Sequence, residues 1–321
     1  MYDNSMEKLV WQMFILGTGE CLNDSLELGL GGVIFFTRDI QSKEQFKDLI
    51  KSIVLKSKIY PFLSVDQEGG KVERTENIHP RYISPKYAYQ RGKDFLEKQT
   101  QEIAEELKDY GINLNFAPCA DVNTNPKNPI IGERSFSDKP EEVIDGVNIV
   151  SNIYRRNGII PCIKHYPGHG DADKDSHLTL PQIDLPLEEM SRVHIEPFRQ
   201  AVKSGTEMIM AAHLHCTCFD KEVLPSSLSK NAIGYLRNEL GFDGVVISDD
   251  MVMKGVQQFG SLDAIIMGIE AGLDMFIFRD ADRKTFDTVK QLVKIVEASD
   301  ELKQKVIKSN QRIDKLKRLA L

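Results

Sequence analysis

One pattern repeats along the chain: a short apolar, β-branched run followed by a longer amphipathic stretch. Eight such runs are typical of buried strands, at residues 13–17, 31–37, 61–66, 112–118, 159–165, 207–213, 244–250 and 275–278. Apolar residues recur at helical spacing in the stretches 42–57, 94–110, 139–156, 187–204 and 229–240. Apolar strands that alternate with helices indicate a parallel sheet covered by helices, and eight units predict a closed (β/α)8 TIM barrel. An open, doubly wound α/β sheet is the alternative.

The whole sequence is expected to form one domain. No linker rich in Pro, Gly or Ser and no change in composition divides it into halves. We therefore assign residues 1–321 to a single barrel domain, with a core at about residues 10–300 and a C-terminal helix.

Charge and cysteine content narrow the class of protein. With a formal charge of −7, the chain lacks the basic excess of a nucleic-acid-binding surface. Its five cysteines are odd in number and sparse, which is typical of reduced thiols. Residues 1–20 do not resemble a secretory leader, and no run reaches the roughly 18 apolar residues that span a membrane. We expect a cytoplasmic monomer that binds a small molecule rather than nucleic acid or a membrane.

Polar residues gather where the predicted strands end. They are Asp66, Asp121, Lys164, His165, His213, Asp249 and Asp250. Any one of them alone is explained as a helix cap or a hydrogen-bonded polar group. In a barrel, however, the carboxyl ends of all the strands meet at one rim, where catalytic groups lie. Their convergence there favours an active site.

The stretch KHYPGHGDADKDSH, residues 164–177, has three possible chemistries. Asp171, Asp173 and Asp175 alternate as at the start of a calcium-binding EF-hand loop. The sixth position of that loop is Ser176 instead of glycine, and the twelfth is Gln182 instead of glutamate. The sequence therefore argues against calcium.

A zinc site is the second possibility. His165 and His169 have the spacing of helical zinc ligands, but Pro167 interrupts the helix that such a pair requires. His213 and His215 would lie on one side of a strand, like the His-x-His pair of metal-dependent hydrolases. A metal-dependent barrel hydrolase that uses His213 and His215 stays open as an alternative.

The third possibility is a loop that transfers protons. Gly168 and Gly170 permit a tight and mobile backbone path. Asp175 lies two residues before His177, so its carboxylate can orient the imidazole and hold a useful proton near neutral pH. A solvated histidine is the simpler interpretation of the same residues.

Residues 164–177 also resemble a family signature, the Lys-His-x-Pro-Gly-His-Gly-x-x-x-x-Asp-Ser-His of the glycoside hydrolase family 3 β-N-acetylglucosaminidases. Other blocks resemble the same family in the same order: GGVIFFTRD, SVDQEGGKVER, NFAPCADVN, IGERSF, PSSLSKNAIGYLRNELGFDGVVISDDM and AGLDMFIF. The resemblance runs from Gly31 to Phe278. It implies a (β/α)8 barrel that removes a terminal β-linked N-acetylglucosamine with retention of anomeric configuration.

The resemblance also implies roles for individual residues. Asp249 matches the nucleophile that forms a covalent glycosyl-enzyme, and His177 matches the acid/base, with Asp175 as its partner. The positions that match sugar-binding residues are Asp66, Arg74, Arg134, Lys164 and His165. Alternatively, Arg134 and Lys164 only neutralise buried acids. We expect no cofactor and no metal.

The resemblance extends to a substrate class. The resembling blocks all belong to the family's barrel domain. In this respect the sequence resembles the family's single-domain branch, which is linked to peptidoglycan recycling. The expected substrate is therefore an N-acetylglucosaminyl muropeptide or a chitooligosaccharide. Besides the metal-dependent hydrolase, two functions stay open: a phosphorylase, because a histidine acid/base repels phosphate less than a carboxylate does, and a sugar-binding barrel without catalysis.

Overall fold

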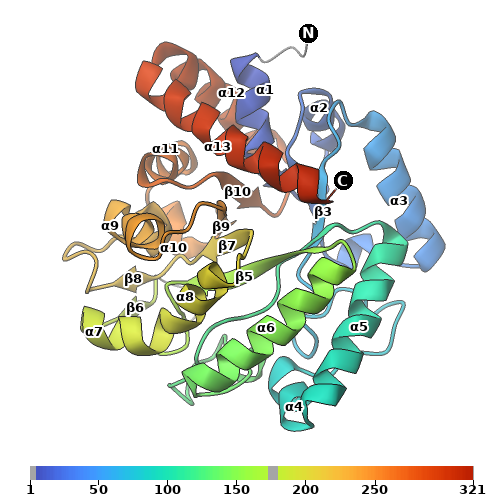
Figure 1. The fold of residues 1–321 in the computed structure, drawn as a ribbon. Helices are drawn as coiled ribbons and strands as arrows, with labels where there is room; N and C mark the ends of the chain where they lie inside the picture. Colours follow the sequence, from blue (N-terminus) through green and yellow to red (C-terminus); the bar gives the residue numbers. More distant parts are fainter. Residues whose placement is uncertain (1–4, 173–179, 321) are drawn as a thin grey trace.

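The computed structural model describes residues 5–172 and 180–320. Eight parallel strands close into a barrel in the order β1-β10-β9-β7-β5-β4-β3-β2 (Figure 1). The strands are β1 Phe14–Leu16, β2 Gly32–Phe35, β3 Phe62–Val65, β4 Leu114–Asn115, β5 Ile160–Tyr166, β7 Met208–Ala211, β9 Val245–Asp250 and β10 Met275–Phe278. Each strand overlaps one of the eight predicted runs. The predicted (β/α)8 barrel is therefore confirmed, and the open sheet is wrong.

Helices surround the barrel (Figure 1). They are α1 Met6–Gln12, α2 Leu22–Glu27, α3 Lys43–Lys56, α4 Pro85–Gln90, α5 Lys93–Tyr110, α6 Pro140–Arg156, α7 Leu187–Glu189, α8 Glu196–Lys203, α9 Lys230–Gly234, α10 Lys254–Gln257, α11 Ser261–Ala271, α12 Arg283–Ala298 and α13 Asp300–Ala320. Local chemistry explains where they start: the Ser42 hydroxyl accepts the Gln45 N–H ahead of α3, and Pro140 occupies the first turn of α6. The predicted C-terminal helix is α13.

Two of the predicted helices are interrupted by wide turns. The stretch 187–204 divides into α7, a π-turn at Met190–His194 and α8. The Ile195 N–H donates to the Met190 carbonyl, five residues back, at 2.8 Å. Pro197 has no N–H, and in a regular helix its ring would clash with the carbonyl four residues back, so the widened turn accommodates it. The stretch 229–240 likewise divides into α9 and a π-turn at Tyr235–Glu239.

A second, two-stranded sheet was not predicted. Strand β6, Gln182–Ile183, pairs in parallel with β8, His215–Cys216. Strands of two residues are too short to show an alternating pattern. Because β7 ends at Ala211, His213 lies between β7 and β8, and the hypothesis that His213 and His215 share one strand was wrong.

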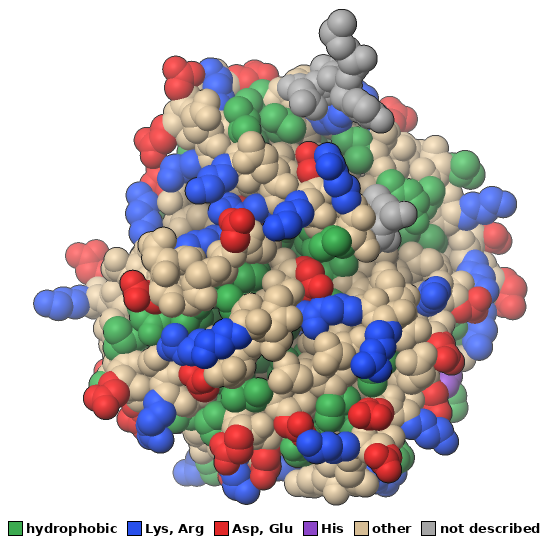
Figure 2. Space-filling view, in the orientation of Figure 1, with side chains coloured by type: hydrophobic (Ala, Val, Ile, Leu, Met, Phe, Trp, Pro, Cys, Tyr) green, Lys and Arg blue, Asp and Glu red, His purple; other side chains and the backbone are tan. Residues whose placement is uncertain are grey.

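The outer surface carries charges of both signs. Figure 2 shows Lys and Arg side chains interspersed with Asp and Glu over the face that is drawn. Among the helices of residues 5–172 and 180–320, we find none whose length and apolar character would suffice to cross a membrane.

Helix α13 carries a buried lysine against the barrel. The Lys317 ammonium donates to the Gln12 Oε1 at 2.8 Å and to the Tyr60 carbonyl at 3.0 Å. It also lies 5.2 Å from the centroid of the Phe62 ring. Burial lowers the pKa of Lys317 to about 7.

We therefore expect Lys317 to make the stability of the fold rise with pH. Between the folded pKa of about 7 and the usual lysine pKa, the unfolded chain binds more protons than the folded one, so raising the pH favours folding. From pH 7 to 9 the free energy of unfolding of wild type should rise by about 2 kcal/mol relative to Lys317→Met, measured by urea denaturation.

The exposed Lys315, two residues away on the same helix, supplies the matched control. The Lys315→Met variant should follow the wild-type pH dependence. Parallel curves for wild type and Lys317→Met would contradict the expectation.

Candidate active site

A pocket opens at the carboxyl ends of the barrel strands. Its unfilled space, open mouth included, is about 760 Å³. It is lined by six of the eight residues given a role above: Asp66, Arg74, Arg134, Lys164, His165 and Asp249. They come from the ends of β3, β5 and β9 and from the loops that follow β3 and β4, which is where barrel enzymes carry their chemistry. The other two, Asp175 and His177, lie outside the described residues.

A network of ion pairs forms one wall of the pocket. Lys164 Nζ lies 2.7 Å from Asp66 Oδ1 and 2.6 Å from Glu68 Oε1. The Arg134 guanidinium makes a two-pronged contact with Glu68, at 2.9 and 2.8 Å. Arg74 Nη2 lies 3.7 Å from Asp66 Oδ2. Asp66 is therefore held between two cations, and its carboxylate can still accept hydrogen bonds from sugar hydroxyls.

Glu68 is the residue of this wall that the sequence analysis missed. Burial alone would raise the pKa of its carboxyl, but Arg134 and Lys164 together lower it far below the usual value. Arg134 and Lys164 thus line the pocket and also neutralise a buried acid, so the two interpretations of these residues are compatible. Glu68 lies in the block SVDQEGG, two residues after Asp66. This short distance from a predicted sugar-binding residue is the sequence feature that could have identified Glu68 as part of the site.

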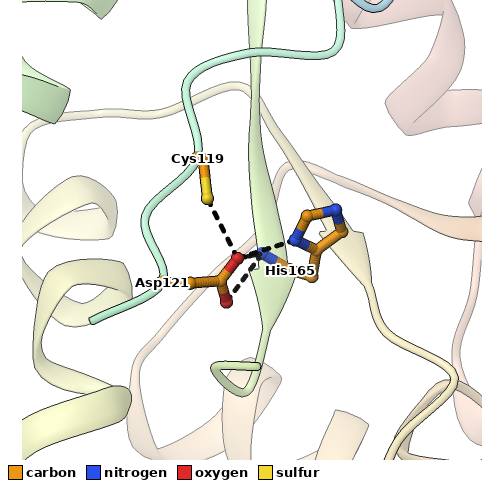
Figure 3. A group of neighbouring side chains, drawn as sticks. All are labelled: Cys119, Asp121 and His165. Atoms are coloured by element: carbon orange, nitrogen blue, oxygen red, sulfur yellow. Dashed lines mark hydrogen bonds and ion pairs between the residues drawn. The ribbon is translucent and has the colours of Figure 1, made fainter. Parts of the chain in front are cut away.

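A second hydrogen-bonded group lies at His165 (Figure 3). His165 Nδ1 is 2.7 Å from Asp121 Oδ2, and the Cys119 thiol donates to the same oxygen at 3.1 Å. The backbone N–H of His169 donates to Asp121 Oδ1 at 2.6 Å. Burial raises the pKa of the Asp121 carboxyl, but His165 and His169 lower it further than burial raises it, so Asp121 stays charged.

Cys119, Asp121 and His165 also form the only group of three potential metal ligands within residues 5–172 and 180–320. One ligand atom from each lies within 4.8 Å of the others. Burial and the Asp121 charge raise the pKa of the Cys119 thiol well above its usual value. Metals bind the thiolate rather than the thiol, so these side chains suit a hydrogen-bonded cluster better than a metal site.

Asp249 is the next-to-last residue of β9, lines the pocket and is partly exposed. Its Oδ1 accepts the backbone N–H of Asp250 at 2.7 Å. Burial raises the pKa of this carboxyl, but His165, His213, the Asp250 N–H and Lys164 together bring it below the usual value. The side chain is therefore an ionised carboxylate at a pocket wall, which is the state a nucleophile requires.

Asp250 has different surroundings, although it is the next residue. Burial raises the pKa of its carboxyl, and the contact with Arg279 only partly offsets this. A carboxylate that is already paired with a guanidinium is a weaker nucleophile, so the geometry favours Asp249 over Asp250.

Three further histidines belong to the two pairs considered above as zinc ligands: His169, His213 and His215. His213 Nδ1 is 2.7 Å from the Ser227 hydroxyl, whereas His215 Nδ1 is 3.2 Å from the Leu224 carbonyl. The two rings have separate partners, and neither belongs to the three-ligand group found among the described residues. His169 lines the pocket, and burial lowers its pKa to about 4, which keeps the ring neutral at physiological pH.

Comparison with known proteins agrees with this arrangement. The family model "Glycosyl hydrolase family 3 N terminal domain" matches residues 18–316. Beta-hexosaminidase A of Pseudoalteromonas piscicida is 32% identical over 90% of this chain and 53% of its own length. The Beta-hexosaminidase of Tolumonas auensis is 33% identical over 77% of this chain and 75% of its own. The chain thus spans about half of the first relative and three quarters of the second.

Solved structures show the same likeness. A glycoside hydrolase family 3 β-N-acetylglucosaminidase from a Paenibacillus species superposes with a TM-score of 0.92 and 30% identity, over 98% of this chain and 62% of that protein. The β-N-acetylglucosaminidase of Thermotoga maritima gives a TM-score of 0.83 and 27% identity, over 95% of this chain and 66% of that protein. From the family model and these relatives, the chain belongs to glycosyl hydrolase family 3.

Proposed function

We propose that the protein is a retaining exo-β-N-acetylglucosaminidase. The observation that supports this most is the ionised Asp249 carboxylate, which lies beside the ion-pair network of Asp66, Glu68, Arg134 and Lys164. The relatives of this chain are named β-hexosaminidases, which agrees with this proposal. Carboxylates, a guanidinium and an ammonium together offer acceptors and donors for the hydroxyl and acetamido groups of one sugar.

The proposed mechanism has two steps. In the first, the Asp249 carboxylate attacks the anomeric carbon and forms a covalent ester, while the glycosidic bond breaks and His177 donates its proton to the leaving oxygen. In the second, His177 takes a proton from water, which attacks the anomeric carbon and releases Asp249. The roles of His177 and Asp175 rest on their match to the family's signature.

We also propose that the natural substrate is an N-acetylglucosaminyl muropeptide or a chitooligosaccharide and that the protein acts as a cytoplasmic monomer. The relatives named β-hexosaminidases support an N-acetylhexosaminide as the substrate. The five cysteines are free thiols, which is consistent with a reducing compartment. Rates on a muropeptide fragment and on chitobiose, compared directly, rank the two substrates.

The first test uses aryl glycosides. In the presence of EDTA, wild type should release para-nitrophenol from the β-N-acetylglucosaminide more than about a hundredfold faster than from the β-glucoside. The reason is that protein groups that hydrogen-bond the acetamido group have no partner when a glucoside is bound. Loss of activity with EDTA would instead support the metal-dependent hydrolase. Turnover that depends on added phosphate would identify a phosphorylase, and wild type that binds the sugar without ever turning it over would be a binding protein.

A further inference from the structure

Asp121 lies beneath the pocket wall and accepts several hydrogen bonds at once. It is fully buried, and its two carboxylate oxygens accept from His165 Nδ1, from the Cys119 thiol and from the His169 backbone N–H. The His165 backbone N–H adds a longer contact, 3.3 Å from each oxygen. None of the roles inferred from the sequence uses this carboxylate.

The partners of the His165 ring determine where its proton lies. Arg134 Nη2 lies 3.3 Å from His165 Nε2, on the side of the ring away from Asp121. A guanidinium only donates hydrogen bonds, so Nε2 must accept with its lone pair. A carboxylate only accepts, so Nδ1 must carry the hydrogen. Both contacts require the same neutral tautomer, with the proton on Nδ1.

We propose that Asp121 is a positioning residue that holds His165 as the Nδ1–H tautomer, so that the lone pair of Nε2 is a hydrogen-bond acceptor. Arg134 contacts this lone pair at 3.3 Å, and a donor of the bound sugar would replace Arg134 there. The group that His165 recognises is then a donor, a hydroxyl or amide N–H of the bound sugar. That the ligand is N-acetylglucosamine rests on the function proposed above, whereas the tautomer is a property of the protein without ligand.

The test replaces Asp121 with asparagine, which has nearly the same shape. If the amide oxygen keeps the His169 N–H, the amide NH2 faces His165 Nδ1 and donates to it. The ring must then carry its proton on Nε2, where it points at the donor Arg134 and no longer accepts from the sugar. We expect Asp121→Asn to raise KM and the dissociation constant for N-acetylglucosamine by about 10- to 100-fold, with kcat changed by less than about threefold.

Nitrogen-15 NMR of the histidine rings reads the tautomer without any need for turnover. Wild type should show His165 protonated on Nδ1, and Asp121→Asn should show it protonated on Nε2. A wild-type ring protonated on Nε2 would overturn the proposal, even if the variant failed to fold. A correct tautomer in a protein that neither binds nor hydrolyses the N-acetylglucosaminide would instead leave the proposal standing and refute the proposed function.

Two further variants separate positioning from a general structural role. Cys119→Ala removes a donor to the same carboxylate without touching the ring, so KM and the His165 tautomer should stay as in wild type. In a His165→Ala background, Asp121→Asn should add little further loss of binding, because its effect passes through that ring. Equal losses with and without His165 would overturn the proposal. So would stoichiometric zinc binding to wild type that Cys119→Ala abolishes, since it would identify a metal site.

Discussion

Replacing Asp249 with asparagine is expected to lower kcat on para-nitrophenyl β-N-acetylglucosaminide by about four orders of magnitude. The amide has almost the same shape but no negative charge, so it cannot form the glycosyl ester. The loss corresponds to about 5.5 kcal/mol of transition-state stabilisation. Sugar binding should survive, because the network at Asp66, Glu68, Arg134 and Lys164 is untouched. Steady-state rates and calorimetric binding of N-acetylglucosamine measure the two effects separately.

The neighbouring carboxylate supplies the matched control. Asp250→Asn makes the same chemical change one residue away, in a side chain that contacts Arg279. We expect a much smaller loss of kcat from it than from Asp249→Asn. Equal losses in the two variants, or a larger loss from Asp250→Asn, would reverse the assignment of the nucleophile.

Glu68→Gln should have the largest effect on stability. The change removes the only carboxylate that pairs with Arg134 among the described residues and leaves that nearly buried guanidinium uncompensated. Breaking a buried ion pair in this way costs about 3–5 kcal/mol of unfolding free energy. The variant should also bind the sugar more weakly, because Arg134 and Lys164 lose the carboxylate that fixes their positions.

The same substitution at an exposed ion pair is the control for Glu68. Glu270 lies 2.8 Å from Lys230 on the surface, with most of the lysine side chain exposed. Glu270→Gln should leave the denaturation midpoint nearly unchanged, because solvent screens such a pair. If Glu68→Gln were equally harmless in urea denaturation, the buried network would not be what holds this wall of the pocket.

The barrel was predictable because its signal is local. Strands that are buried on both faces are apolar throughout, and helices with one buried face show their period in the sequence. Boundaries were less predictable: the apolar run 112–118 contains a strand of only two residues, Leu114–Asn115. The sheet of β6 and β8 escaped prediction because its pairing comes from the fold and leaves no periodic trace in two residues.

The site was predictable only in part. Six of the eight residues that match family motifs line one pocket, because each lies at the end of a strand, or in a loop after one, at the same rim of the barrel. Glu68 and Asp121 contact side chains that are distant in sequence, Arg134 and His165 respectively. Such contacts depend on which loops the closed barrel brings together, which no local pattern records.

The most direct test of the central claim is to look for the sugar on Asp249. In His177→Ala, an aryl N-acetylglucosaminide still has a good leaving group, but water loses its base, so the covalent intermediate should accumulate. Mass spectrometry of the quenched variant should find one N-acetylglucosaminyl group on the protein, located to the peptide that contains Asp249. An adduct on another residue, or turnover whose first product is the α-anomer, would contradict a retaining mechanism through Asp249.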